Sequence, residues 1–230
     1  MLVLEGLRLA EGEFTLSADW SVAKGEKVAV IGPSGAGKSS LLMAIAGFFA
    51  PVAGRILWQG ADLAALAPAK RPISLLFQDQ NLFPHLTLFE NLGLGLTSGA
   101  RLAPGDAALI DAALERTGLG GMGARRPAEL SGGQHGRAAL ARALLRARPL
   151  LLLDEPFAAL GPALKAEMLA LVCEVADAQG AAVLMVTHDP ADAHRLGGKT
   201  VLVADGVAAA PVPTAALFAD PPQALRDYLG

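Results

Sequence analysis

Short apolar runs, each ending at a glycine or a charged residue, recur along the chain and predict buried strands. The clearest are "KVAVIG" (27–32), "RPISLLFQD" (71–79), "LLLLDEP" (150–156) and "AAVLMVTHD" (181–189). A strand and turn are predicted at 54–63, and a hairpin around Asp205-Gly206 at 199–211. The run 37–50 has helical spacing instead. Strands that alternate with helices indicate an α/β fold with a parallel sheet.

The pattern changes between 86 and 148, which is rich in alanine and leucine and has helical periodicity without a strong strand run. We therefore expect a helical subdomain inserted between two parts of the sheet, within a single domain that spans 1–230. The tail 210–230 is rich in proline and alanine. We expect it to pack loosely.

Composition excludes some classes of protein. Hydrophobic residues make up 53% of the chain, yet the longest apolar runs have the length of a strand and are too short to span a bilayer. The start of the chain lacks the basic region and cleavage site of a signal peptide. The formal net charge of −3 does not indicate a nucleic-acid partner. Cys173 is the single cysteine, which rules out an intrachain disulfide, and we expect it to be buried and structural.

The stretch "GPSGAGKSS" follows the strand at 27–32 and opens a helix, and it matches the phosphate-binding pattern G-x-x-x-x-G-K-[ST]. Glycines allow the backbone N–H groups of such a loop to point at phosphate oxygens. Lys38 would neutralise the β- and γ-phosphates, and the Ser39 hydroxyl would bind Mg²⁺. The predicted nucleotide-binding residues are Gly32, Pro33, Ser34, Gly35, Ala36, Gly37, Lys38, Ser39 and Ser40.

Polar residues end three other predicted strands. Asp154 follows four leucines and would hold Mg²⁺, and Glu155 beside it would polarise an attacking water. Gln78 would reach Mg²⁺ or that water, and His188 would donate to the γ-phosphate. Without any family context, the sequence around His188 favours an ordinary histidine at the rim of the sheet.

A second helix start has the features of an anion site. In "LSGGQ", Ser131 and the N–H groups of Gly132 and Gly133 precede a helical run, and Gln134 follows them. Ser131 could equally be a simple helix N-cap, and both roles are open to the same serine.

The ordered set "GPSGAGKSS", "FQ", "LSGGQ", "LLLLDEP" and "VTHD" resembles the ATPase subunits of ABC transporters over nearly the whole chain. The resemblance implies a P-loop NTPase fold with a RecA-like core, N-terminal antiparallel strands and an inserted helical subdomain. It implies ATP and Mg²⁺ as cofactors. It also implies a head-to-tail dimer, in which Ser131, Gly132, Gly133 and Gln134 of one copy contact the ATP held by the other copy.

The finer resemblance is to importers, and among these to the ATPases of thiamine importers. It rests on "RPISLLFQDQNLFPHLTLFENLGLGL", "LLLLDEPFAALGPALKAEML" and "VADG". It implies a peripheral protein on the cytoplasmic face of the inner membrane, bound to a polytopic permease and indirectly served by a periplasmic binding protein. The permease would dock near 79–96, where Leu82, Phe83, Pro84, Leu86, Leu88 and Phe89 would divide between the protein's own core and the partner.

Other functions remain open from the sequence. The cargo could be another small solute, such as iron or a polyamine. A soluble ABC ATPase acting on nucleic acid or ribosomes is a second alternative, which the acidic charge and the single ATPase unit oppose. A module that binds nucleotide without hydrolysing it is the third, which the intact Glu155 opposes.

Three parts of the chain depart from the family pattern. Gly161 stands where an aspartate at the dimer interface is usual, which removes a carboxylate and would loosen the turn, although Pro162 follows it. His135 and Gly136 replace longer polar residues after LSGGQ, the signature segment of the family (130–134). The usual adenine-stacking aromatic is missing near Glu11, and Phe14 is the nearest candidate, ahead of Trp20.

Overall fold

The computed structural model describes residues 1–77, 82–97 and 102–229, and its centre is a parallel sheet. The sheet has the strand order β9 (Lys199–Ala204), β3 (Lys27–Ile31), β8 (Ala182–Val186), β7 (Leu150–Asp154) and β6 (Ile73–Leu76). Every residue of β7 and β8 is buried, which explains their uninterrupted apolar sequences. Each of the stretches predicted at 27–32, 71–79, 150–156 and 181–189 therefore contains a strand, with residues 78 and 79 outside the described part of the chain.

A largely antiparallel sheet, in which β10 (Val207–Ala208) and β2 (Phe14–Val22) pair in parallel, continues this parallel one at the β9 edge. It contains β10, β2, β1 (Leu2–Glu11), β4 (Ala53–Trp58) and β5 (Ala61–Asp62), in that order. β9 and β10 form the predicted hairpin, since they pair antiparallel across Asp205 and Gly206. A short strand, β11 (Val212–Pro213), pairs antiparallel with the start of β9, at Thr200 and Lys199.

Two apolar layers lie on opposite faces of the parallel sheet, because alternate residues of a strand point to opposite sides. Val28 and Val30 of β3 face α1 (Lys38–Ala46), whose Leu41 joins the same cluster. Ala29 of β3 faces the other cluster, to which α5 (Pro162–Gln179) and α6 (Pro190–Leu196) contribute. The sheet thereby fixes the loops at its carboxyl edge between two packed layers.

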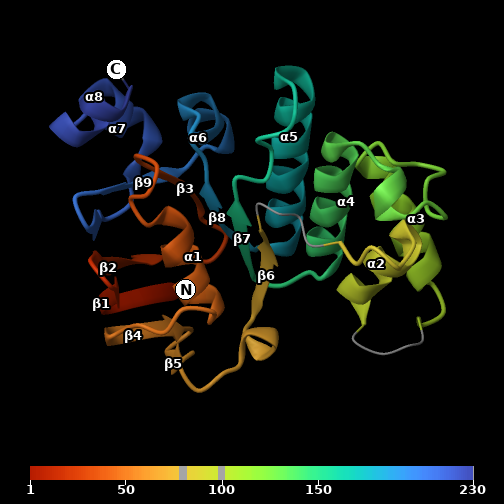
Figure 1. Cartoon of the computed structure of the whole chain (residues 1–230), viewed down its shortest axis with the longest axis horizontal. Helices are drawn as coiled ribbons and strands as arrows, with labels where there is room; N and C mark the ends of the chain where they lie inside the picture. The colour runs from red at the N-terminus through yellow and green to blue at the C-terminus, as the bar shows by residue number, and fades with distance from the viewer. Residues whose placement is uncertain (78–81, 98–101, 230) are drawn as a thin grey trace.

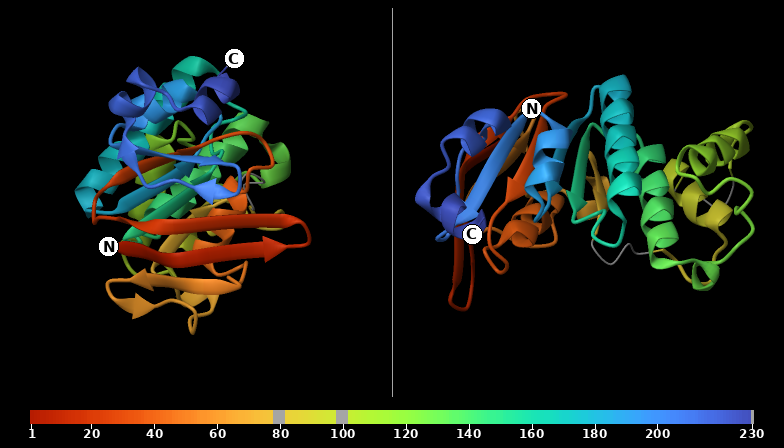
Figure 2. Two further views of the ribbon diagram at one scale, coloured as in Figure 1. Left: turned by 90° about the vertical axis from the view of Figure 1, so that its left-hand side faces the viewer. Right: turned by 90° about the horizontal axis from the view of Figure 1, so that it is seen from above.

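The predicted helical region 86–148 contains α2 (Leu88–Leu96), α3 (Asp106–Arg116) and α4 (Gly132–Leu145), with no strand among its described residues. A third apolar cluster, which includes Leu88, Leu92 and Ile110, holds these helices together. Figures 1 and 2 show α2 and α3 at the end of the molecule opposite to β1 and β4. Short 3₁₀ turns stand at Pro68–Lys70 and Pro127–Glu129.

The expectation of a loosely packed tail was wrong. The tail forms α7 (Thr214–Ala219) and α8 (Gln223–Leu229), and Leu225 is fully buried in the second cluster. Alanines and prolines at the surface of these helices concealed the few apolar anchors from the sequence pattern. Cys173, expected to be buried, is half-buried and packs against the same cluster.

None of the helices described in the structure has the length and apolar character needed to cross a bilayer.

Candidate nucleotide-binding and hydrolysis site

The loop between β3 and α1 is shaped by glycines. Gly32 has φ +146°, and a Cβ there would lie 2.0 Å from the carbonyl oxygen of Val203. Gly37 has φ +98°, and a Cβ there would lie 2.6 Å from the ring of Phe14. Both positions therefore require glycine, for the backbone angle and for the close approach of neighbours.

The Lys38 side chain folds back onto this loop and hydrogen-bonds to its backbone. Its Nζ donates to the carbonyl oxygens of Gly32 (2.7 Å) and Pro33 (2.8 Å), and the residue is buried. Burial lowers the pKa of Lys38, while the negative charges of Glu155 and Asp154 oppose that effect. The loop thus surrounds a fixed cation, which suits the binding of a polyphosphate.

Asp154, the last residue of β7, meets the start of α1. The Ser39 hydroxyl donates to Asp154 Oδ1 at 3.0 Å. Burial raises the pKa of Asp154, the Ser39 hydrogen bond opposes this, and the charge of Glu155 adds to it. A hydroxyl and a carboxylate held together are hard oxygen donors, and they fit a Mg²⁺ ion that takes its other ligands from phosphates and water.

Glu155 and His188 lie at the ends of adjacent strands, β7 and β8. Glu155 has φ +45°, a strained conformation for a residue with a side chain, and its N–H donates to Val186 O at 3.1 Å. The Glu155 Oε2 atom lies 3.3 Å from His188 Nδ1. The structure therefore brings together two of the three predicted catalytic side chains; Gln78 lies outside the described residues.

An open cavity of about 440 Å³ joins these elements. It is lined by Phe14, Ser34, Gly35, Gly37, Lys38, Ser39, Ser40 and Glu155. Of the two aromatic candidates for contact with adenine, Phe14 at the start of β2 lines this cavity. Trp20 is buried instead, and its indole N–H donates to the carbonyl oxygen of Ala208.

The signature segment, LSGGQ at 130–134, does not line the cavity at the phosphate loop of its own chain. Ser131 is the N-cap of α4, and with Gln134 it forms a capping box: Ser131 Oγ accepts from Gln134 N, and Gln134 Oε1 accepts from Ser131 N. Ser131 and Gly132 are exposed, and neither lines the cavity at the phosphate loop. Figure 1 shows α4 separated from α1 by the sheet.

His135 and Gly136, the two residues after LSGGQ, depart from the family pattern, yet α4 continues through them as a regular helix. His135 Nε2 lies 2.7 Å from the Pro127 carbonyl oxygen, and Gly136 is buried within the helix. Gly161 is the N-cap of α5 with φ −68° and ψ 158°, a conformation open to any residue, and Pro162 occupies the first helical position. The glycine thus leaves the start of α5 in ordinary geometry but without a side-chain cap.

One group of charged residues near His188 escaped the sequence analysis. Lys165 Nζ lies 2.8 Å from both Asp189 Oδ2 and Asp192 Oδ2, and Thr187 Oγ1 donates to Asp192 at 2.7 Å. Burial lowers the pKa of Lys165, but the hydrogen bonds to Asp189 and Asp192 and their negative charges together outweigh burial and raise the pKa above its usual value. The sequence signal for this group was the pair Asp189 and Asp192 at the start of a helix. That signal does not identify Lys165 as their partner, because Lys165 lies more than 20 residues earlier in the chain.

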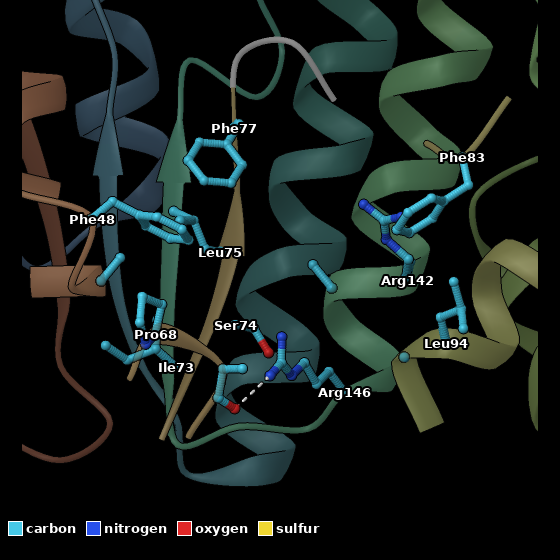
Figure 3. Close-up of a pocket in the computed structure, with 14 residues that line it drawn as sticks. Phe48, Pro68, Ile73, Ser74, Leu75, Phe77, Phe83, Leu94, Arg142 and Arg146 are labelled. Carbon is cyan, nitrogen blue, oxygen red and sulfur yellow. Dashed lines mark hydrogen bonds between the residues drawn. The ribbon is translucent and has the colours of Figure 1, made fainter. Parts of the chain in front are cut away.

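A second cavity, of about 340 Å³, lies between the sheet and the helical region. Figure 3 shows Phe48 and Phe77 on one wall and Phe83, Leu94 and Arg142 on the other. Arg146 donates to Ala69 O across its lower end. Of the apolar residues predicted at 79–96, Leu88 is fully buried, while Phe83 and Pro84 are exposed.

Comparison with known proteins gives consistent results. The family model described as ABC transporter matches residues 16–158. The chain is similar to the "Thiamine import ATP-binding protein ThiQ" of Cereibacter sphaeroides, with 70% identity, and of Ruegeria sp., with 56% identity, each over all of both chains. It also resembles the dimeric ATP-binding cassette MJ0796 bound to ADP and Pi, with a TM-score of 0.82 and 28% identity, over 93% of this chain and 99% of the other. The P-loop NTPase fold predicted from the sequence is confirmed.

Proposed function

The chain belongs to the ABC transporter family, and on that basis we propose that it is the ATP-hydrolysing subunit of a thiamine importer. The cargo follows from the full-length relatives, which are named for thiamine import. One observation carries the chemistry: Lys38, Ser39, Asp154 and Glu155 converge at a glycine-shaped loop.

ATP is held by its phosphates in this proposal. The N–H groups of the loop 32–39 and the positive end of α1 bind the β-phosphate, and Lys38 exchanges its two carbonyl contacts for phosphate oxygens. Phe14 contacts the adenine side of the cavity. The cation at the centre of the loop makes the site selective for a polyanion.

The residues at the ends of β7 and β8 act on the attacking water. Glu155 accepts its proton as general base, and His188, 3.3 Å away, donates a hydrogen bond to the γ-phosphate. Mg²⁺, when bound, neutralises the charge that develops on the phosphates. Ser39 and Asp154 would hold it, together with Gln78.

A second copy of the chain completes the site. Ser131, Gly132, Gly133 and Gln134 are exposed or half-buried at the start of α4, and none of them lines the cavity at their own phosphate loop. The Ser131 hydroxyl and the N–H groups of Gly132 and Gly133 can therefore cap the γ-phosphate of a partner. The dimeric state of the similar cassette MJ0796 supports this arrangement. Binding of ATP at the interface would then tighten the dimer, and hydrolysis would loosen it.

The permease is proposed to dock at the cavity shown in Figure 3. The exposed rings of Phe48 and Phe83 and the exposed Leu94 line this cavity beside Arg142 and Arg146. Such an apolar groove with a basic wall suits a short amphipathic helix of a membrane protein. The protein would thereby sit peripherally at the cytoplasmic face of the inner membrane.

The variant Glu155→Gln tests the hydrolysis step. It keeps the loop and loses the base, so we expect ATP to remain bound in a dimer and turnover to fall about 10²- to 10⁴-fold. Gel filtration with Mg-ATP and a phosphate-release assay measure both effects. Turnover at the wild-type rate in this variant contradicts the role of Glu155.

The cargo is tested with the complete transporter. The permease, its binding protein and this subunit are purified together, and ATP hydrolysis is measured with thiamine, with a polyamine or with iron. Stimulation by thiamine alone supports the proposal. Stimulation by another solute assigns a different importer, and failure to bind any permease favours a soluble ATPase.

A further inference from the structure

His188 has few neighbours to fix its ring. Its side chain is 59% exposed, and the contact with Glu155 at 3.3 Å is the one hydrogen bond of the ring seen among the described residues. The direction of the ring therefore depends on how firmly the backbone of residues 187–189 is held.

One side of that backbone is held by the charged group at α6. Asp189 caps the helix by accepting from Ala191 N at 2.9 Å, and its other oxygen binds Lys165. Its own N–H donates to Thr187 Oγ1 at 3.1 Å. These bonds fix the residues on both sides of His188 but leave the His188 carbonyl to another partner.

That partner comes from the last helix of the chain. The Tyr228 hydroxyl of α8 donates to the carbonyl oxygen of His188 at 2.7 Å, across 40 residues of sequence. The Tyr228 ring packs against the second core cluster, in which Leu225 of the same helix is fully buried. The donor is thus mounted on a packed element rather than on a free terminus.

The surroundings keep this donor protonated. Burial raises the pKa of Tyr228 above its usual value, and the nearby negative charges of Glu155 and Asp189 raise it further. The phenol therefore retains its proton at neutral pH. The hydrogen bond to the His188 carbonyl oxygen places the phenol oxygen beside the loop that carries His188, 40 residues away in the sequence.

We propose that Tyr228 is a positioning residue for ATP hydrolysis, which holds the His188 carbonyl and thereby keeps the His188 ring beside Glu155. The inference rests on the proposed roles of His188 and Glu155. It assigns a function to the two C-terminal helices (Figure 1). α7 packs on α6 and β9, and the Tyr228 hydroxyl of α8 donates a hydrogen bond to the loop that carries His188.

The matched variants are Tyr228→Phe and Asp227→Asn. The first removes one oxygen and keeps the buried ring. The second changes the preceding residue of α8, whose exposed carboxylate contacts Gln223 and not the site. For Tyr228→Phe we expect kcat to be about three- to tenfold lower, because one net hydrogen bond is lost. The KM for Mg-ATP should be unchanged. Asp227→Asn should match wild type in both constants.

A second measurement does not depend on turnover. In NMR spectra of the full chain, the ring signal of His188, assigned with His188→Gln, should shift and broaden in Tyr228→Phe and stay in place in Asp227→Asn. An unchanged kcat together with an unchanged His188 signal overturns the inference. The proposed function fails separately, if Glu155→Gln hydrolyses ATP as fast as wild type.

Discussion

The two glycine-rich helix starts of this protein, at α1 and at α4, look alike in sequence but are built differently. Gly37 before α1 is left-handed, with φ +98°, and has no side chain to cap the helix. Ser131 before α4 is extended, with φ −71°, and forms a complete capping box with Gln134. The first helix leaves its N–H groups to a ligand, whereas the second satisfies two of its own.

The residues around the two helix starts also differ, since one start lies in a cavity and the other is exposed to solvent. The start of α1 faces a cavity with a buried lysine, a buried aspartate and Glu155. The start of α4 is exposed at Ser131 and Gly132. An anion can therefore be enclosed by one chain at α1, but at α4 it can only be covered from one side. A second copy of the chain would supply the concave site that an anion at the start of α4 lacks, in agreement with the head-to-tail dimer proposed above.

The largest effect we expect on nucleotide affinity comes from Lys38→Ala. The variant removes the cation inside the loop, and the loss of charge-assisted hydrogen bonds should weaken binding by about 3 kcal/mol, or more than about 100-fold. Isothermal titration calorimetry with Mg-ATP measures this, with Lys24→Ala at an exposed lysine as the control. Near-normal affinity would refute the assignment of the phosphate loop.

Ser131→Arg separates the two helix starts. The phosphate loop is untouched, so the monomer should bind nucleotide with wild-type affinity, whereas the homodimer should not hydrolyse it. The same calorimetry and a phosphate-release assay measure both. Mixing this chain with Lys38→Ala chains creates one dimer site without either defect, and some recovery of hydrolysis is expected. Normal hydrolysis by the Ser131→Arg homodimer leaves Ser131 with a capping role alone.

Ser131→Ala isolates the capping role. Loss of the acceptor for Gln134 N should cost about 1 kcal/mol of stability and lower the melting temperature by about 2–4 °C. Ser131→Asn is the control, because asparagine caps as well as serine. A melting temperature equal to wild type in Ser131→Ala shows that the capping box contributes little. Scanning calorimetry of the nucleotide-free protein is the measurement.

A third helix start gives the smallest effect. Gly161 caps α5 without a side chain, and a Cβ there meets nothing within 4 Å. Gly161→Asp should add a cap and a charge at the positive end of the helix, for a gain of about 0.5–1 kcal/mol and about 1–3 °C. Gly161→Ala separates the cap from the backbone effect. A loss of stability in Gly161→Asp contradicts the geometry of this turn.

Much of this protein could be predicted from sequence because the signals were local. A buried strand such as 150–154 is a run of apolar residues, and the phosphate loop is a fixed spacing of glycines around Lys38. The tail was misjudged because its anchors, such as Leu225, are single residues among alanines and prolines. Lys165 was missed because a lone lysine on an exposed-looking helix carries no pattern.

The sequence by itself determined the strands, the loop, the order of the motifs and the capacity of Ser131 to cap α4, since each depends on residues within a few positions of one another. Only the tertiary structure decided which strand ends adjoin: Asp154 meets Ser39 across 115 residues, and His188 meets Glu155 across 33. It alone placed Tyr228 on the His188 carbonyl. The physical reason is that such contacts follow from strand order and from the burial of helices on the sheet, which no local spacing encodes.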